Sequence, residues 1–381
     1  MITEEQVRAA LRNVLDPEIG KPIEDIGMLK GIAIEGATVR IDVLITIEGC
    51  PLKDRIERDV AGALMPLEGV ERVQVELSPM SQEEREALVR QLRGPGAAPE
   101  GPRAFFQDGR TTVIAVASGK GGVGKSSVTV NLAAALVRDG HSVGVLDADV
   151  WGFSVPRMLG VSGQPVGFDG MILPLEAHGV KVISMGFFVP EEQPVIWRGP
   201  MLHKAIEQFL GDVYWGELDF LLCDLPPGTG DVSISLASFL PGASMLVITT
   251  PQEAARKVAE RAGKMAERTN LRPIGVIENM SWFACPHCGE RTSIFGDGGG
   301  RGAAATLGVP LLGRVPLIPA LREGGDAGMP IVLSEPDSPA AQALAEASRE
   351  LARATRSKVG KPLTLIARPG AAAAAGGHQH G

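Results

Sequence analysis

The spacing of hydrophobic residues along the chain predicts two regions of different architecture. In the first 92 residues, apolar positions recur at helical spacing after Thr3 and again from Leu52 to Leu64. Three further stretches alternate apolar and polar residues as strands do, namely Met28–Ile34, Thr38–Ile47 and Val70–Leu77. The order helix, strand, strand, helix, strand predicts a small α+β domain over residues 1–92.

Beyond residue 110 the pattern consists of short apolar runs separated by helical segments, and it predicts an α/β domain over residues 110–357. The expected strands are Thr112–Ser118, Ser142–Leu146, Leu218–Asp224, Ala243–Thr250, Pro273–Glu278 and Leu311–Pro316. This alternation is typical of a doubly wound, mainly parallel sheet, in which ligands bind at the carboxyl ends of the strands. Candidate chemistry is therefore expected where these runs end.

Two stretches lack such periodicity. Residues 93–109 are rich in proline and glycine, which predicts a flexible linker between the two domains. Residues 358–381 include a low-complexity run of alanine and glycine, and they are expected to be disordered.

Composition and charge narrow the classes of function. The 381 residues carry a formal net charge of −8, which argues against a protein that coats nucleic acid, because the phosphate backbone favours a basic face. No apolar run reaches the roughly 18 residues that span a bilayer, and the charged, amphipathic start is unlike a signal peptide. The chain is therefore expected in the cytoplasm, without a membrane or nucleic-acid partner.

The segment Gly119–Ser127, with the sequence GKGGVGKSS, matches the P-loop pattern and lies between an expected strand and an expected helix. Its glycines let the backbone turn N–H groups toward phosphate, Lys125 reaches the β- and γ-phosphates, and the Ser126 hydroxyl suits Mg²⁺. The positive end of the following helix adds to the same anion site. The residues expected to bind ATP here are Gly119, Lys120, Gly121, Gly122, Val123, Gly124, Lys125, Ser126 and Ser127.

A Walker B-like strand follows later in the chain. The apolar run Leu218–Asp224 ends in an aspartate, whose carboxylate is expected to hold Mg²⁺ through water or through Ser126. Asp147 and Asp149 follow the strand after the P-loop helix, at the end where ligands bind in open α/β sheets. Asp147 has a second interpretation, because strand-end aspartates often only cap loops.

Of the four cysteines, Cys285 and Cys288 form a C-x-x-C motif. Two thiolates at this spacing can hold a metal ion or an iron–sulfur cluster, but either site usually needs four protein ligands, and the chain has no second C-x-x-C. A zinc site and a redox pair are the alternatives. Cys223 alternates with the core positions of its strand and is expected to be a buried structural thiol. Cys50 precedes a predicted helix and fits either a reactive thiolate or a small buried residue.

The lysine after the first glycine, Lys120, gives the loop the form KGGVGKS. It resembles the deviant Walker A motif of the family that includes MinD, ParA, the arsenite-pump ATPase and the nitrogenase iron protein. The resemblance implies a homodimer in which Lys120 touches the phosphates bound by the other subunit. Its positive charge would stabilise the charge on those phosphates, as an arginine finger does in other NTPases. It also implies that Asp149 orients the attacking water or contacts Mg²⁺, and that Asn279 reads the adenine edge. The catalytic residues are then Lys120, Lys125, Asp149 and Asp224.

Three further segments narrow the resemblance to the Mrp/ApbC group of P-loop iron–sulfur cluster carriers. They are DADVWG from residue 147, SMGF from residue 184 and WRGPM from residue 197. The group holds a 4Fe-4S cluster between subunits, so the resemblance implies that Cys285 and Cys288 of two chains supply its four ligands. It implies an ATP-hydrolysing homodimer that passes the cluster to apo iron–sulfur proteins.

The start of the chain resembles the MIP18-like family of iron–sulfur assembly domains through DPE from residue 16, DIGMLK from residue 25 and TIEGCPL from residue 46. Two other functions stay open at this point. One is a MinD- or ParA-like positioning ATPase, although the tail lacks the amphipathic helix that a membrane-bound relative needs. The other is an ATPase with a structural zinc ion between subunits.

Overall fold

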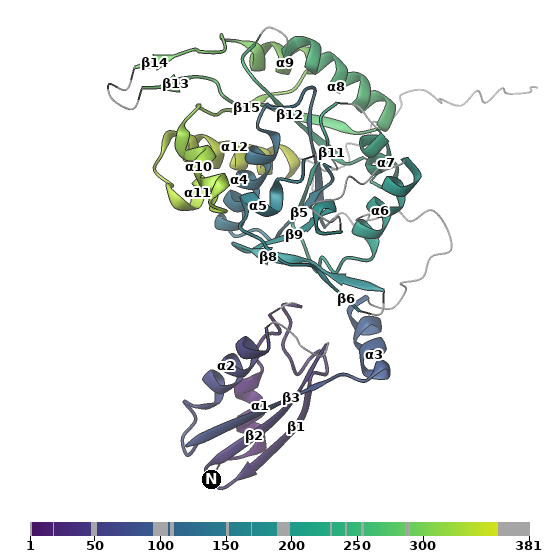
Figure 1. Cartoon of the computed structure of the whole chain (residues 1–381), viewed down its shortest axis with the longest axis vertical. Helices are drawn as coiled ribbons and strands as arrows, with labels where there is room; N and C mark the ends of the chain where they lie inside the picture. Colours follow the sequence, from purple (N-terminus) through teal and green to yellow (C-terminus); the bar gives the residue numbers. More distant parts are fainter. Residues whose placement is uncertain are drawn as a thin grey trace, which may run out of the picture.

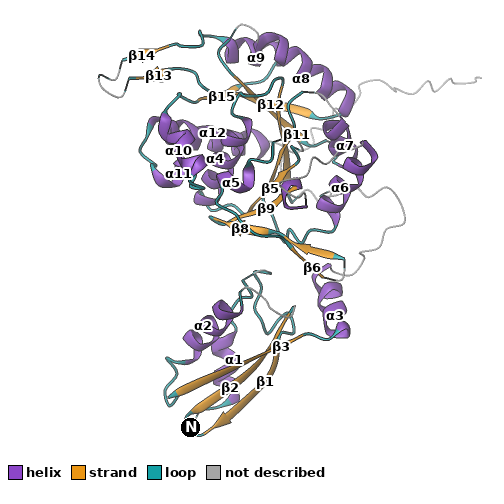
Figure 2. Ribbon diagram, in the orientation of Figure 1, coloured by secondary structure: helices purple, strands orange, loops and turns teal. Residues whose placement is uncertain are grey.

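The computed structural model describes residues 2–17, 19–46, 52–93, 106, 110–149, 152–168, 170–188, 199–228, 231–240, 242–252, 255–285, 288 and 290–356. Cys50, most of the expected linker and all of the expected tail region lie outside these residues. The described residues form a small unit with its own three-stranded sheet and a larger unit built on an eight-stranded sheet (Figure 1, Figure 2).

The elements of the small unit are α1 (Glu4–Leu11), β1 (Leu29–Glu35), β2 (Thr38–Ile45), α2 (Lys53–Leu64), β3 (Arg72–Pro79) and α3 (Gln82–Arg93). β2 pairs antiparallel with β1 and parallel with β3. Thr3 begins α1 with a capping box, in which the Gln6 N–H donates to the Thr3 hydroxyl at 3.3 Å. The predicted order of helices and strands is found, and α3 follows it as an element that the pattern did not predict.

The strands of the larger sheet are β4 (Thr112–Ser118), β5 (Val143–Asp147), β8 (Leu175–Ala177), β9 (Val180–Ser184), β10 (Phe220–Asp224), β11 (Ser244–Thr249), β12 (Arg272–Glu278) and β15 (Leu311–Arg314). They lie in the order β15-β12-β11-β4-β10-β5-β9-β8, and β8 alone is antiparallel to its neighbour. The predicted α/β fold with a mainly parallel sheet is confirmed.

Helices cover both faces of this sheet. They are α4 (Lys125–Arg138), α5 (Val155–Met158), α6 (Gly199–Gly211), α7 (Asp231–Phe239), α8 (Ala255–Thr269), α9 (Gly299–Leu307), α10 (Pro319–Asp326), α11 (Ile331–Ser334) and α12 (Pro339–Arg356), with a 3₁₀ turn at Met185–Phe188. Figure 1 shows α4, α5 and α10 to α12 on one side and α6 to α9 on the other. None of the described helices has both the length and the apolar character needed to cross a lipid bilayer.

The alternation of side chains along β4 explains the two layers. Ala115 and Ala117 belong to the core beneath α6 to α9, whereas Ile114 and Val116 belong to the core beneath α4 and α12. All four side chains are nearly inaccessible to solvent. Because both faces are filled, the ends of the strands are the part of the sheet where a ligand can approach.

A short hairpin in the larger unit packs against the small unit. It consists of β6 (Val166–Phe168) and β7 (Met171–Leu173), and Figure 1 shows α3 of the small unit below it. Met171 and Leu173 are each 2% exposed and belong to the same buried cluster as Leu88 and Val89 of α3. No pattern in the sequence predicts this contact, because its partners are distant along the chain and each is an ordinary core residue of its own element.

Candidate functional site

The loop between β4 and α4 forms a cradle at the carboxyl end of the sheet. A cavity of about 210 Å³ is lined by Ser118, Lys120, Gly121, Gly122, Val123, Gly124, Lys125, Ser126, Ser127, Asp149, Ser154, Met158 and Pro227. Gly122 and Gly124 adopt φ angles of 76° and 78°, a left-handed conformation that a side chain disfavours. Gly119, at the start of the loop, is the one predicted ATP-binding residue of the loop that does not line this cavity.

Asp224, at the end of β10, is fully buried and accepts hydrogen bonds from the P-loop helix. Lys125 Nζ lies 2.7 Å from its Oδ2, Ser126 Oγ donates to the same oxygen at 2.5 Å, and Thr129 Oγ1 donates to Oδ1 at 2.9 Å. A hydroxyl and a carboxylate oxygen side by side are ligands of the kind that Mg²⁺ prefers, so Ser126 and Asp224 fit a magnesium ion. Sequence reasoning missed Thr129, although its spacing of four residues from Lys125 places both on one face of the helix.

Asp149 lies in the wall of the same cavity. Its Oδ2 is 3.9 Å from Lys125 Nζ, and the residue is 8% exposed. β5 delivers it there because β5 and β10 are parallel neighbours whose ends meet at one edge of the sheet. The structure therefore brings Lys125, Asp149 and Asp224 together at one site.

Asp147 is fully buried and does not line the cavity. Its Oδ1 accepts the Asp149 N–H at 3.2 Å, and its Oδ2 accepts the Ser184 hydroxyl at 3.0 Å. Burial, followed by the negative charge of Asp224, raises the pKa of Asp147 to about 8. Bonds of this kind hold the turn after β5 in place, which favours the loop-capping interpretation of Asp147 over a direct role with ligand.

We expect Asp147→Asn to flatten the pH dependence of stability in protein freed of nucleotide and Mg²⁺. Because the pKa of Asp147 rises from 3.8 to about 8 on folding, the folded state binds this proton more tightly. Its contribution to stability is therefore complete below about pH 4 and is lost as the pH rises toward about 8. Urea unfolding of both proteins between about pH 5 and pH 8 measures the slopes. Equal slopes would contradict the raised pKa.

Lys120 is exposed at the rim of the cavity, and its side chain contacts a residue of the same chain. Its Nζ donates to Gln252 Oε1, and the Thr250 hydroxyl donates to the same oxygen at 3.1 Å. Thr250 and Gln252 follow β11, so the P-loop and the next strand end are linked through this lysine. Sequence reasoning did not single out Gln252, because nothing along the chain indicates that it meets Lys120.

Asn279 comes directly after β12, which lies on the same side of β4 as β11 and opposite β10 and β5, and its side chain reaches the P-loop. Its Nδ2 donates to the Val123 carbonyl at 2.9 Å, and its backbone N–H donates to the Thr249 carbonyl at 2.8 Å. The residue is 2% exposed, and among the described residues no donor reaches its Oδ1. The amide is therefore fixed by its nitrogen, its oxygen is a buried acceptor without a partner among the described residues, and Asn279 does not line the cavity of the P-loop.

Cys285 and Cys288 lie between the two strands of a hairpin that follows β12 along the chain. The hairpin pairs β13 (Phe283–Ala284) with β14 (Arg291–Thr292), and Figure 1 shows it projecting from the larger unit. Cys285 donates its backbone N–H to the Glu290 carbonyl at 2.9 Å. Cys285 is partly buried, Cys288 is exposed, and neither takes part in a disulfide among the described residues.

Cys223 is buried in β10, as predicted for a structural thiol. Burial, followed by the charge of Asp224, raises the pKa of this thiol well above its usual range. It therefore stays protonated and inert, and it is set apart from the two cysteines of the hairpin.

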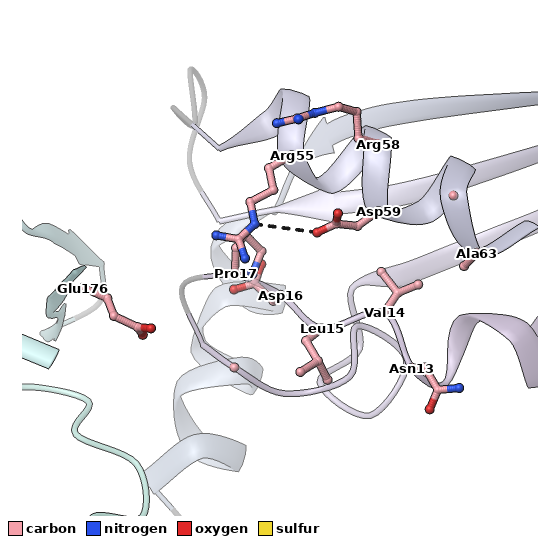
Figure 3. Close-up of a pocket in the computed structure, with 12 residues that line it drawn as sticks. Asn13, Val14, Leu15, Asp16, Pro17, Arg55, Arg58, Asp59, Ala63 and Glu176 are labelled. Carbon is pink, nitrogen blue, oxygen red and sulfur yellow. Dashed lines mark ion pairs between the residues drawn. The ribbon is translucent and has the colours of Figure 1, made fainter. Parts of the chain in front are cut away.

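The small unit carries a second cavity, of about 560 Å³, next to Asp16 of the DPE segment. Figure 3 shows Arg55 and Asp59 of α2 beside it, 3.7 Å apart, and Glu176 of β8 facing it from the larger unit. Asp16 is buried and its Oδ1 accepts the Ile19 N–H at 2.8 Å. This bond is that of an aspartate that stabilises a turn.

Each of the two units matches a known protein family. A ParA model described as NUBPL iron-transfer P-loop NTPase matches residues 110–352, and one described as iron–sulfur cluster assembly protein matches residues 4–77. The chain is 50% identical over 367 residues to the iron–sulfur cluster carrier protein of Mycobacterium bovis, covering 94% of this chain and 96% of that protein. It is 42% identical over 358 residues to the protein of the same name from Synechocystis, covering 92% and 98%.

A solved structure shares the fold of the larger unit. The nucleotide-binding protein from Archaeoglobus fulgidus, in complex with ADP, is similar with a TM-score of 0.53 and 37% sequence identity. The similarity covers 61% of this chain and 91% of that one.

Proposed function

Because the chain belongs to the ParA-type family of iron-transfer P-loop NTPases, we propose that it is an ATP-hydrolysing iron–sulfur cluster carrier. In this proposal two copies hold one 4Fe-4S cluster between them and pass it to apo-proteins. The observation that carries the proposal is the continuity of β12. Its end places Asn279 against the P-loop, and its continuation is the hairpin that bears Cys285 and Cys288.

The cradle supports the nucleotide half of the proposal. The loop N–H groups and Lys125 bind the phosphates, and Lys125 exchanges its contact with Asp224 for phosphate oxygens. Ser126 and Asp224 would hold Mg²⁺, which would neutralise charge that develops on the phosphates. Asp149, in the cavity wall beside Lys125, orients the attacking water.

Asn279 supports adenine as the base. A buried acceptor without a partner costs about 1–3 kcal/mol, and the exocyclic amino group of adenine is a donor that offsets this cost. Because Nδ2 donates to the Val123 carbonyl, Oδ1 is the atom of the amide that would accept from the base in this proposal. Guanine, which presents a carbonyl oxygen at the corresponding position, meets Oδ1 with an acceptor and is disfavoured.

The number of sulfur ligands supports a shared cluster. A 4Fe-4S cluster is held by four thiolates, and one hairpin supplies two. Two chains related by a twofold axis supply all four from the same residues. The exposed position of Lys120 at the cavity rim leaves its ammonium group able to reach a second chain.

Anaerobic reconstitution of the full chain with iron and sulfide tests the proposal. We expect visible thiolate-to-iron absorption, about four iron atoms per two chains, and a dimer by light scattering. Loaded protein is then expected to activate an apo-protein that needs such a cluster. A colourless monomer would overturn the proposal, and a colourless dimer that retains one zinc ion would instead support a structural zinc site.

A further inference from the structure

We propose that Trp282 is a positioning residue that transmits nucleotide binding at the P-loop to the cysteine hairpin. The inference rests on the proposed function for the identity of the two sites, and it adds the physical link between them. Trp282 lies between Asn279 at the cradle and Cys285 in the hairpin, on the one segment of chain that joins both.

The segment begins in direct contact with the P-loop. A Cβ atom built on Gly124 would lie 2.3 Å from Asn279 Nδ2 and 3.7 Å from Met280 Cε, so both side chains pack on the loop. Met280 has a φ of 57°, a left-handed conformation that is rare for a residue with a side chain. The chain therefore turns sharply at the cradle, and a shift of the loop reaches the turn through two side chains.

The next residues are tied to the chain that follows β15. The Val315 N–H donates to the Glu278 carbonyl at 2.8 Å, and the Ser281 N–H donates to the Val315 carbonyl at 2.9 Å. The Leu317 N–H then donates to the Trp282 carbonyl at 2.7 Å. This run of bonds continues the pairing of β12 with β15 beyond the sheet, so the segment is an ordered connection.

The indole ring joins this connection to the far arm of the hairpin. The guanidinium of Arg314 lies 5.6 Å from the ring centroid, and that of Arg291 lies 5.1 Å from it. Arg314 is fixed by Glu278 at 2.9 Å and by Asp297 at 2.7 Å. Arg291 belongs to β14 and pairs with Ala284, the neighbour of Cys285. Trp282 thus fastens the cysteine hairpin to the strand that ends at the nucleotide site.

Trp282 is the residue of this arrangement that can be tested cleanly. Glu278 is fully buried, and it also accepts the Gly300 N–H at 2.6 Å, so truncating Glu278 or Arg314 would leave a buried group unpaired and disturb the fold. Trp282→Ala removes the ring and leaves Asn279, both cysteines and all backbone bonds in place. Trp282→Phe keeps an aromatic face, although a weaker one, for the two arginines.

The test uses the full-length protein with no metal or cluster bound at its cysteines. The alkylation rate of each cysteine is measured by mass spectrometry, with and without added MgATP. In the wild type, MgATP is expected to change the rate at Cys285 by at least about threefold, while the buried Cys223 stays unreactive. In Trp282→Ala the ratio of the Cys285 alkylation rates with and without MgATP is expected to fall to about one, while the ATP affinity stays within about twofold of wild type. Trp282→Phe should recover part of the MgATP effect on Cys285. Ile294→Ala, an exposed apolar truncation just after β14, is the matched control and should behave as wild type.

Three results would overturn the inference: no effect of MgATP in the wild type, an unchanged ratio in Trp282→Ala, or a loss of ATP affinity above about tenfold in that variant, which would make Trp282 a structural residue. Failure of the proposed function is a separate result. Protein that stays colourless after iron loading while its Cys285 responds to MgATP would refute the carrier function and leave the link intact.

Discussion

Replacing Cys285 with serine is expected to abolish cluster binding while ATP affinity changes by no more than about twofold. A serine hydroxyl is not ionised near neutral pH and is a hard oxygen ligand, whereas cluster iron is held by soft thiolates. In a shared site the substitution removes two of four ligands from every dimer, so the loss exceeds that of a single ligand. Iron and sulfide analysis after reconstitution measures the cluster, and calorimetric titration measures ATP binding.

Thr292→Ala is the matched control for this variant. Thr292 pairs with Phe283 in the same hairpin, is exposed and carries no sulfur, so its truncation tests the hairpin without touching a ligand. It is expected to retain the full cluster. If Cys285→Ser also retained a full cluster, the hairpin would not be the cluster site, and Cys50 would become the next thiol to replace.

The nucleotide cradle is predictable from the sequence because each of its parts has a local signal. Lys125 and Ser126 are neighbours within one glycine-rich motif, and Asp224 ends an apolar run that is buried in the sheet. Parallel strands then bring these ends to one edge without any further information. The same logic explains why the α/β fold was predicted and why the small hairpin of β6 and β7 was not, since its three-residue strands are too short to show a period.

Contacts between residues that are far apart in the sequence cannot be predicted from such local signals. Lys120 and Gln252 are 132 positions apart, and neither position indicates the other. Trp282 reads as an ordinary aromatic residue until Arg291 and Arg314 are seen beside its ring. Thr129 can be predicted in part. Its helical spacing from Lys125 places both residues on one face of the helix, but the spacing does not indicate that Thr129 bonds to Asp224.

Replacing Lys120 with alanine is expected to lower the rate of ATP hydrolysis by about a thousandfold, the scale of loss seen when an arginine finger is removed. The ATP affinity of a single chain should change little, because in its own chain Lys120 bonds to Gln252, while Lys125 is the lysine beside Asp149 and Asp224. Steady-state hydrolysis and nucleotide titration separate the two effects. Gln252→Ala is the control for loss of the contact itself and should keep most of the activity.

Mixing two inactive variants decides whether Lys120 acts across the dimer. When Lys120→Ala and Asp149→Asn chains are combined in equal amounts, half of the dimers contain one of each. In such a dimer the Lys120→Ala chain keeps its own Asp149 and receives Lys120 from its partner, so one of its two sites is complete. Action in trans therefore predicts recovery of about a quarter of the wild-type rate. A mixture as inactive as its components would place Lys120 in the site of its own chain and remove the need for a dimer in hydrolysis.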